Sequence, residues 1–313
     1  MAGASCVVGD WGTSHLRLFL CDEDGTVLDS VTGPGAAQGD FANVFDSLVA
    51  KWPAAQRESP TVLSGMVGSS IGWVQAPYIA CPVEPATIAT SCVSLRAGAI
   101  QIVPGLSCRN RFDAPDFMRG EETQILGAIQ LDSALRRGSH LLCLPGTHTK
   151  WVLLQEGAVS DFLTAPTGEL FNLLRDHSVL VRERAEAICS AAPGFELALS
   201  QVEHFSLAQV LHRLFECRSR TLDGQLAPGE SAAFLSGLLI ASDIAGALDV
   251  FARSMPSRAV HVIGAPQLIE LYAAGLDRQH CHTSSTDGVV AAVAGLTHVR
   301  QQLIRRSVTT NAN

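Results

Sequence analysis

Two short turns in the chain combine glycine with hydroxyl side chains directly after an apolar run. In the first, GDWGTS, Asp10 is followed by Gly12, Thr13 and Ser14. Glycine lets the backbone approach a ligand closely, and the hydroxyl and N–H groups of such a turn can hydrogen-bond phosphate oxygens. Mg²⁺ prefers one or two carboxylates and keeps much of its water shell. Asp10 is therefore predicted to hold Mg²⁺ beside phosphate, although an aspartate that only caps a hairpin gives the same local pattern.

The second turn, PGTHTK, repeats this chemistry later in the chain. It contains Gly146, Thr147 and His148, and it continues into Thr149 and Lys150. Two such turns can bind the β- and γ-phosphates of a nucleotide from both sides and stabilise charge during phosphoryl transfer. The sequence has no G-x-x-x-x-G-K-[ST] motif, so this is not a P-loop. Lys150 either reaches a phosphate or lies on the surface of a strand.

The elements around each turn follow the same order. β-prone runs at 6–12 and 16–22 flank the first turn, and an Asp-Gly turn leads to a third run, which predicts a three-stranded meander. Residues 140–165 repeat this order around the second turn. We therefore predict a duplicated architecture whose halves face each other.

The remaining segments complete two predicted domains. An N-terminal lobe is predicted for 1–114, with a helix at about 40–56 and a glycine-rich loop after a strand at about 61. A C-terminal lobe is predicted for 115–313, and its last helix can return to the N-terminal lobe. Because a single hydrophobic core stops growing near this chain length, two lobes are expected.

Composition excludes several classes of protein. Hydrophobic residues make up 47% of the chain, charged residues 17%, and the net charge is −8. Such a chain can bury a large core, and it lacks the basic clusters of a nucleic-acid binder. The nine cysteines form no C-x-x-C pair, and HCH at 280–282 has no partner cluster for a metal site. With no basic leader and no run of about 18 apolar residues, a cytoplasmic protein without a membrane partner is expected.

Five segments, in this order, resemble the 2-dehydro-3-deoxygalactonokinases of the actin/hexokinase/Hsp70 ATPase superfamily: GDWGTSHLR, SGMVGS, PDFMRGEE, LPGTHTKW and VIGAPQL. The resemblance spans essentially the whole chain. It implies an α/β fold with two ribonuclease H-like lobes and a central cleft, the actin-like ATPase fold. It also implies ATP and Mg²⁺ as cofactors and phosphorylation of the 6-hydroxyl of 2-dehydro-3-deoxy-D-galactonate, giving 2-dehydro-3-deoxy-6-phosphogalactonate in galactonate breakdown. The implied partner is this small sugar acid, and a homodimer would be unsurprising.

The resemblance also implies roles for single residues. The attacking hydroxyl needs a carboxylate to accept its proton. By position Glu121 matches this base and Glu122 is the alternative, although related sugar kinases commonly carry Asp there and glutamates at a helix start often only complement the helix dipole. Arg119 is predicted to bind the substrate carboxylate through its planar guanidinium. The VIGAP segment resembles the adenosine motif, with Gly264 and Ala265 against adenine.

The glycine-rich loop after the strand at about 61 is predicted to bind the hydroxylated chain of the sugar. Met66 and Trp73 in this loop are equally compatible with core positions. The segment 166–174 is interpreted as a lid over the sugar. The candidate substrate-binding residues of the loop are Ser64, Gly65, Met66, Ser69 and Trp73.

Two other functions remain open. A phosphohydrolase acting on polyphosphate or ppGpp shares the fold and the glutamate, but a broad basic channel would be expected. A non-catalytic switch that responds to ATP or sugar is the second alternative. Regulators of that kind typically carry a basic helix-turn-helix before the first phosphate strand, and only six residues precede Val7.

Overall fold

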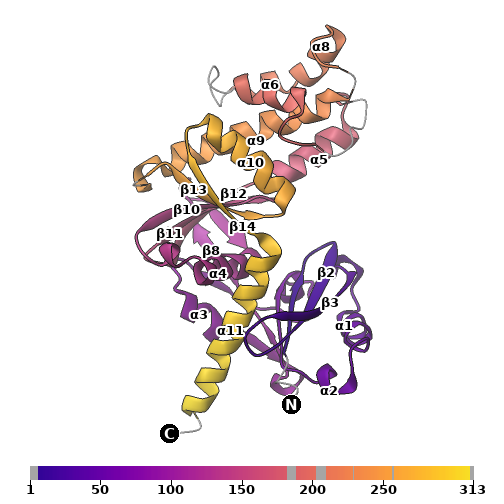
Figure 1. Cartoon of the computed structure of the whole chain (residues 1–313), viewed down its shortest axis with the longest axis vertical. Coiled ribbons are helices and arrows are strands. Elements are labelled where there is room, and N and C mark those ends of the chain that lie inside the picture. The colour runs from indigo at the N-terminus through magenta and orange to yellow at the C-terminus, as the bar shows by residue number, and fades with distance from the viewer. Residues whose placement is uncertain (1–5, 182–187, 202–208, 228, 256, 311–313) are drawn as a thin grey trace. The chain divides into compact units, whose positions relative to one another are not determined.

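A computed structural model of the chain shows two compact units (Figure 1). The described residues are 6–181, 188–201, 209–227, 229–255 and 257–310. Unit 1 comprises Met1–Gly138, Leu154–Asp161 and Gly288–Asn313. Unit 2 comprises Ser139–Leu153 and Phe162–Asp287. The boundary expected after residue 114 does not coincide with this division, because 115–138 lie in unit 1.

Two helices explain why 115–138 group with unit 1. Helix α4 (Glu121–Leu131) packs along α11 (Gly288–Thr310), the last helix of the chain. A Cβ atom on Gly127 would collide with the backbone of Ala291, and one on Gly295 would collide with the backbone of Thr123. The two glycines therefore let the helix backbones approach closely, and this contact holds α4 and α11 in one unit.

The large sheet of unit 1 has the strand order β3-β2-β1-β4-β7-β6. Strands β1, β2 and β3 form antiparallel neighbours, so the predicted meander is confirmed. Strands β4 and β7 follow in parallel orientation, and β6 pairs antiparallel with β7. The strands are β1 (Cys6–Trp11), β2 (His15–Cys21), β3 (Val27–Pro34), β4 (Thr61–Gly65), β6 (Val93–Leu95) and β7 (Ile100–Ile102).

The second large sheet repeats this arrangement, with the order β12-β11-β10-β13-β14. Three consecutive strands lie side by side, and β13 and β14 follow parallel to β10. The repeated order confirms the α/β fold class with two ribonuclease H-like sheets, whereas the central cleft stays a prediction. The strands are β10 (Ser139–Leu144), β11 (Thr149–Gln155), β12 (Ala158–Ala165), β13 (Ala259–Gly264) and β14 (His282–Asp287).

Helices and a small sheet complete each unit. Unit 1 has α1 (Phe41–Val49), α2 (Ala54–Arg57), α3 (Pro85–Thr90) and the three-stranded sheet of β5 (Tyr78–Ala80), β8 (Gly105–Arg109) and β9 (Pro115–Met118). Unit 2 has α5 (Thr167–His177), α6 (Pro193–Gln201), α7 (Val210–Arg213), α8 (Glu216–Leu222), α9 (Glu230–Phe251) and α10 (Pro266–Arg278).

Helix α9 supplies much of the core of unit 2. Ile240, Ile244 and Phe251 of this helix pack with Trp151 of β11 and Phe195 of α6. Within the described residues, the stretch that begins with α9 is the one that is long and apolar enough to cross a membrane by length and composition, and most of it is buried in the protein. A helix that is apolar on nearly all sides is expected in a core of this kind.

Candidate functional site

The first glycine–hydroxyl turn connects β1 to β2. The Gly12 N–H donates to the His15 carbonyl at 2.9 Å, while the side chains of Thr13 and Ser14 are exposed. The Ala36 N–H donates in turn to the Gly12 carbonyl at 3.0 Å. The turn is therefore held by backbone hydrogen bonds, and both hydroxyl side chains face solvent, as a phosphate-binding turn requires.

Asp10 lies at the carboxyl end of β1, beside the end of β4. Its register partner on β4 is Ser64, and Gly65 follows with φ of +88°. A Cβ on Gly65 would lie 3.3 Å from Asp10 Oδ1, and one on Gly120 would lie 4.0 Å from the same atom. Burial raises the pKa of Asp10, and the positive charge of Arg17 on β2 partly offsets this. Asp10 thus lies close to two predicted site segments, the end of β4 and the start of α4.

The start of α4 is a tight corner around Gly120, which has φ of +108°. The carboxylate of Glu122 accepts the Gly120 N–H at 2.6 Å, and the Thr123 hydroxyl donates to the Gly120 carbonyl at 2.7 Å. Glu121 accepts the Arg119 N–H at 3.0 Å. A residue other than glycine would be strained at this φ, so the corner requires glycine.

The two glutamates of this corner have different surroundings. Glu122 is fully buried, and its Oε1 has no hydrogen-bond partner among the described residues. Burial, with the nearby charge of Glu121, raises the pKa of Glu122 to about 8. Glu121 is only half-buried. Of the two, Glu121 is therefore the residue that keeps exposed surface at the corner.

Arg119 contacts the glycine-rich loop of unit 1. Its Nη2 donates to the Ala76 carbonyl at 2.9 Å, and its guanidinium lies over the ring of Tyr78 at 4.3 Å from the centroid. Nη1 is buried next to Gly68 and has no partner among the described residues. Ser69 in the same loop also has a buried hydroxyl without a described partner. Two unpaired polar groups, Arg119 Nη1 and the Ser69 hydroxyl, therefore lie at the loop predicted to bind sugar.

The other loop residues divide between core and corner. Ser64 is fully buried, and its Oγ lies 3.3 Å from the hydroxyl oxygen of Thr123. Met66 and Trp73 are partly buried and pack against the core of unit 1. The ring of Trp73 lies 6.4 Å from that of Trp11 and meets it edge-on. Both side chains therefore have core contacts, the second of the two roles that the sequence left open.

The second glycine–hydroxyl turn lies between β10 and β11, against the start of α5. The Glu169 N–H donates to the Thr147 carbonyl at 2.8 Å, and a Cβ on Gly168 would collide with the Gly146 carbonyl. His148 is exposed, and its Nε2 lies 2.8 Å from a carboxylate oxygen of Glu169. The close fit at Gly168 places α5 directly against the turn.

Thr149 and Lys150 follow this turn inside β11. The Thr149 hydroxyl lies 2.8 Å from the hydroxyl of Tyr272, whereas Lys150 Nζ donates to the Thr164 hydroxyl at 2.8 Å. Successive side chains of a strand point to opposite faces, so these two residues cannot serve one ligand on one face. Gly146 and Thr147 line a cavity in unit 2, whereas Thr149 and Lys150 do not.

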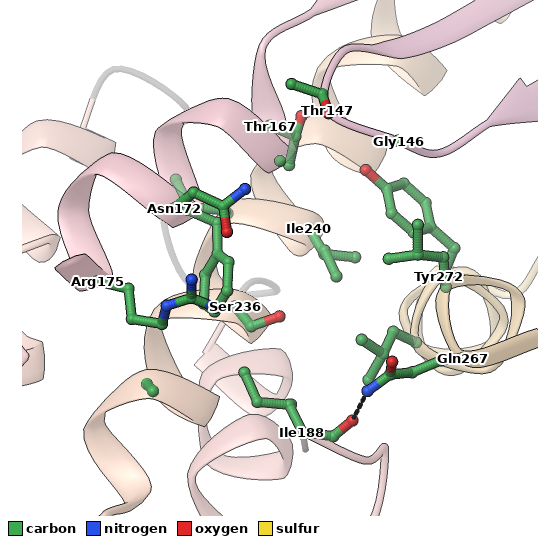
Figure 2. A pocket seen from close by; sticks show the side chains of 16 residues that line it. Gly146, Thr147, Thr167, Asn172, Arg175, Ile188, Ser236, Ile240, Gln267 and Tyr272 are labelled. Atoms are coloured by element: carbon green, nitrogen blue, oxygen red, sulfur yellow. Dashed lines mark hydrogen bonds between the residues drawn. The ribbon is translucent and has the colours of Figure 1, made fainter. Parts of the chain in front are cut away.

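A cavity of about 540 Å³ lies within unit 2 (Figure 2). The second turn, α5, α9 and α10 form its walls. Gly264 and Ala265 of the VIGAP segment are absent from the lining, but Gly264 packs against Pro145 and α10 begins directly after Ala265. The segment 166–174, interpreted as a sugar lid, instead lines this cavity beside the second turn. The residues that line the cavity include Gly146, Thr147, Thr167, Asn172, Arg175, Ser236, Ile240, Gln267, Leu268 and Tyr272.

Asp243 of α9 connects the elements behind this cavity. Its carboxylate accepts hydrogen bonds from Trp151 Nε1 at 2.8 Å, from the Thr167 hydroxyl at 2.7 Å and from the Tyr272 hydroxyl at 2.7 Å. Burial raises the pKa of Asp243, and these hydrogen bonds oppose the shift. The sequence assigned no role to Asp243, although an acid in the middle of a long apolar helix was a usable signal. Thr167, Asn172, Arg175, Ser236, Gln267 and Tyr272 were also missed.

No group of three or more His, Cys, Asp and Glu side chains in the described part of the chain could hold a metal ion. His282 is the first residue of β14 and is exposed there. Asp10 is a single carboxylate, so a cation at that position would take its remaining ligands from phosphate and water.

Two sheets that repeat one order of strands, each with a Gly-Thr turn after its first strand, define the class of protein: an α/β protein with the actin-like ATPase fold. A solved structure with this fold is the activator of 2-hydroxyisocaproyl-CoA dehydratase from Clostridium difficile with bound ADPNP. It has a TM-score of 0.56 at 11% identity and covers 97% of each chain.

The family model of 2-keto-3-deoxy-galactonokinase matches residues 10–299. The chain therefore belongs to the 2-keto-3-deoxy-galactonokinase family, and it is a sugar-acid kinase, as the sequence analysis expected.

Individual relatives agree with this assignment. A protein of Rhizobium meliloti named a probable 2-dehydro-3-deoxygalactonokinase is 40% identical, with 92% of this chain and 94% of that protein covered. The 2-dehydro-3-deoxygalactonokinase of Escherichia coli is 32% identical over the same shares of the two chains, 92% and 94%. A solved structure of a candidate 2-dehydro-3-deoxygalactonokinase from Sinorhizobium meliloti has a TM-score of 0.83 at 36% identity. It covers 95% of this chain and 98% of that chain.

Proposed function

We propose that the protein transfers the γ-phosphoryl group of MgATP to the 6-hydroxyl of 2-dehydro-3-deoxy-D-galactonate, in galactonate catabolism in the bacterial cytoplasm. The names of its relatives support the substrate. The observation that carries the proposal is the corner at Gly120, which lies against Gly65 and close to the Asp10 carboxylate. The residues proposed as the metal-binding acid, the base and the substrate loop all belong to unit 1.

Glu121 is proposed as the base that accepts the proton of the 6-hydroxyl. A base must come within hydrogen-bond reach of the substrate, and Glu121 is half-buried whereas Glu122 is fully buried. Glu122 also uses one oxygen to hold the Gly120 N–H. We therefore assign Glu122 the role of holding the corner.

Asp10 is proposed to hold Mg²⁺. Its buried carboxylate carries a raised pKa that Arg17 offsets in part, and a cation nearby would favour the charged form further. Such a cation, when bound, neutralises charge on the phosphates during transfer. Thr13 and Ser14 of the exposed turn beside Asp10 would donate hydrogen bonds to phosphate oxygens.

The sugar acid is proposed to bind at the loop of unit 1 that Arg119 contacts. The unpaired Nη1 of Arg119 and the unpaired hydroxyl of Ser69 are the polar groups that support this position. Because Nη1 is buried, binding of the substrate carboxylate there requires a small shift of the loop.

The nucleotide is proposed to bind in the cavity of unit 2, with its phosphates at Gly146 and Thr147. The cavity has apolar walls, polar groups at defined points and the volume typical of a small-molecule site. The α5 segment packed against the turn would keep the backbone of Gly146 and Thr147 in place during binding.

A coupled assay of ADP release, run across a panel of 2-keto-3-deoxy sugar acids, tests the function. We expect ADP formation that depends on the sugar acid and is greatest with 2-dehydro-3-deoxy-D-galactonate. Consumption of nucleotide, polyphosphate or ppGpp at the same rate without any sugar would instead indicate a phosphohydrolase. Nucleotide binding without turnover on any member of the panel would indicate a switch.

A further inference from the structure

Most polar side chains in the cavity of unit 2 already have partners inside the protein. A side chain that is already held by a hydrogen bond inside the protein has less capacity left for a ligand than one that has no partner. Thr167 and Tyr272 both donate hydrogen bonds to Asp243. Gln267 donates to the Ile188 carbonyl, and Arg175 pairs with Asp176.

Asn172 of α5 and Ser236 of α9 differ from this group. Neither makes a hydrogen bond with any described residue, and Figure 2 shows the Asn172 amide and the Ser236 hydroxyl directed into the cavity. Ser236 is only 6% exposed. A hydroxyl that faces a cavity and has no partner in the protein can bond a ligand atom without giving up an existing hydrogen bond.

A second serine on α9 shows that the free hydroxyl of Ser236 is not a general property of the helix. The Ser242 hydroxyl donates to the Leu238 carbonyl one turn earlier, at 2.6 Å. This is the usual way for a serine inside a helix to satisfy its hydroxyl. Ser236 makes no such bond and instead directs its hydroxyl into the cavity.

The position of Asn172 along α5 indicates which part of a nucleotide it can reach. Gly168 packs against the second turn, where the phosphates are proposed to bind. Asn172 lies on the same face of α5 one turn later, about 6 Å further along the helix axis. Ile240 and Leu268 are among the apolar side chains that line the same cavity. A planar base with a polar edge fits such surroundings better than a phosphate or a sugar does.

We propose that Asn172 and Ser236 form the polar edge of a base-recognition site and that Asn172 gives the enzyme its preference for adenine nucleotides. An asparagine amide carries both a donor and an acceptor, which matches the amino group and ring nitrogen on one edge of adenine. This inference rests on the proposed function, in which the cavity of unit 2 binds the phosphoryl donor.

The test replaces Asn172 with Asp, which keeps the shape but only accepts hydrogen bonds. Guanine offers adjacent N–H donors on its edge, so N172D is expected to lower the ratio of GTP to ATP dissociation constants at least tenfold. S236A is expected to raise the dissociation constant for ATP about tenfold, the equivalent of one hydrogen bond. Both are measured by calorimetric titration of the full chain, and the KM for the sugar acid should not change.

L173A is the matched control. Leu173 neighbours Asn172 on α5, is 50% exposed and does not line the cavity, so L173A should bind both nucleotides as the unmodified protein does. If N172D weakens the binding of ATP and GTP equally, or leaves both dissociation constants unchanged, the inference is overturned. If N172D changes the nucleotide preference but no sugar acid is phosphorylated by the unmodified protein, the inference stands and the proposed function fails.

Discussion

Glu121 and Glu122 are neighbours in the sequence, and each accepts a backbone N–H of the residue two positions before it. Their difference is burial. The carboxylate of Glu122 is enclosed and partly unpaired, whereas Glu121 keeps exposed surface. A proton acceptor must meet its substrate, so this contrast, which the sequence cannot show, separates the two candidates.

Replacing Glu121 with Gln is expected to lower kcat at least hundredfold, because general base catalysis typically contributes that much. ATP affinity should be largely unchanged, because Glu121 is proposed to accept the proton of the sugar hydroxyl and does not line the proposed nucleotide cavity. E121D retains a carboxylate and should keep part of the activity. Steady-state kinetics and nucleotide titration measure both effects, and full activity of E121Q would transfer the role to another carboxylate.

The buried Glu122 should make stability depend on pH. Its pKa is raised from 4.5 to about 8 in the folded protein, so the native state binds this proton more tightly than the unfolded state does. The free energy of unfolding should therefore fall as pH rises from about 4.5 to about 8, by on the order of a few kcal/mol.

The variant E122Q isolates this contribution, because Asp10 and Asp243 also have pKa values raised by burial. Urea unfolding at several pH values should show a flatter dependence in E122Q than in the unmodified protein. Identical slopes in the two proteins would mean that Glu122 is ionised in the folded state at neutral pH.

At the scale of elements, Asp243 connects β11, α5, α9 and α10 through the side chains that hydrogen-bond it. Two of these side chains, Thr167 and Tyr272, also line the cavity. This buried carboxylate therefore helps to fix the position of the second turn relative to α10.

Y272F removes the hydroxyl that donates a hydrogen bond to Asp243. We expect this variant to be less stable than the unmodified protein by about 1–3 kcal/mol. The KM for ATP should rise, while the KM for the sugar acid stays constant. S242A is the control, since the Ser242 hydroxyl bonds only a carbonyl of its own helix. Thermal unfolding and kinetics with each substrate varied measure the outcome, and equal rises in both KM values would contradict a role confined to the nucleotide cavity.

The sequence predicted the elements that carry local signals. Glycine and hydroxyl residues after apolar runs located both turns, and the repeated order of strands followed from them. Alternation along a strand could also have assigned Thr149 and Lys150 to opposite faces of β11, a signal that was not used. The cavity could not be predicted, because Asn172, Ser236 and Gln267 come from three helices that are distant in sequence.

At the scale of the whole molecule, the last helix belongs with the first part of the chain. A variant that ends at Asp287 loses α11 and the contacts of Gly127 and Gly295. We expect faster hydrogen exchange in β1, β4 and α4, with β13, α9 and α10 of unit 2 much less affected. Mass spectrometry of the exchanged peptides measures this, and uniform loss of protection would show that the two units unfold together.

The chain passes between the units at 138–139, 153–154, 161–162 and 287–288, and two of these positions lie inside β11 and β12. Neither unit corresponds to one uninterrupted piece of the gene. Truncation from either end therefore cannot yield an intact half, and a separately expressed unit would need a circularly permuted or spliced design.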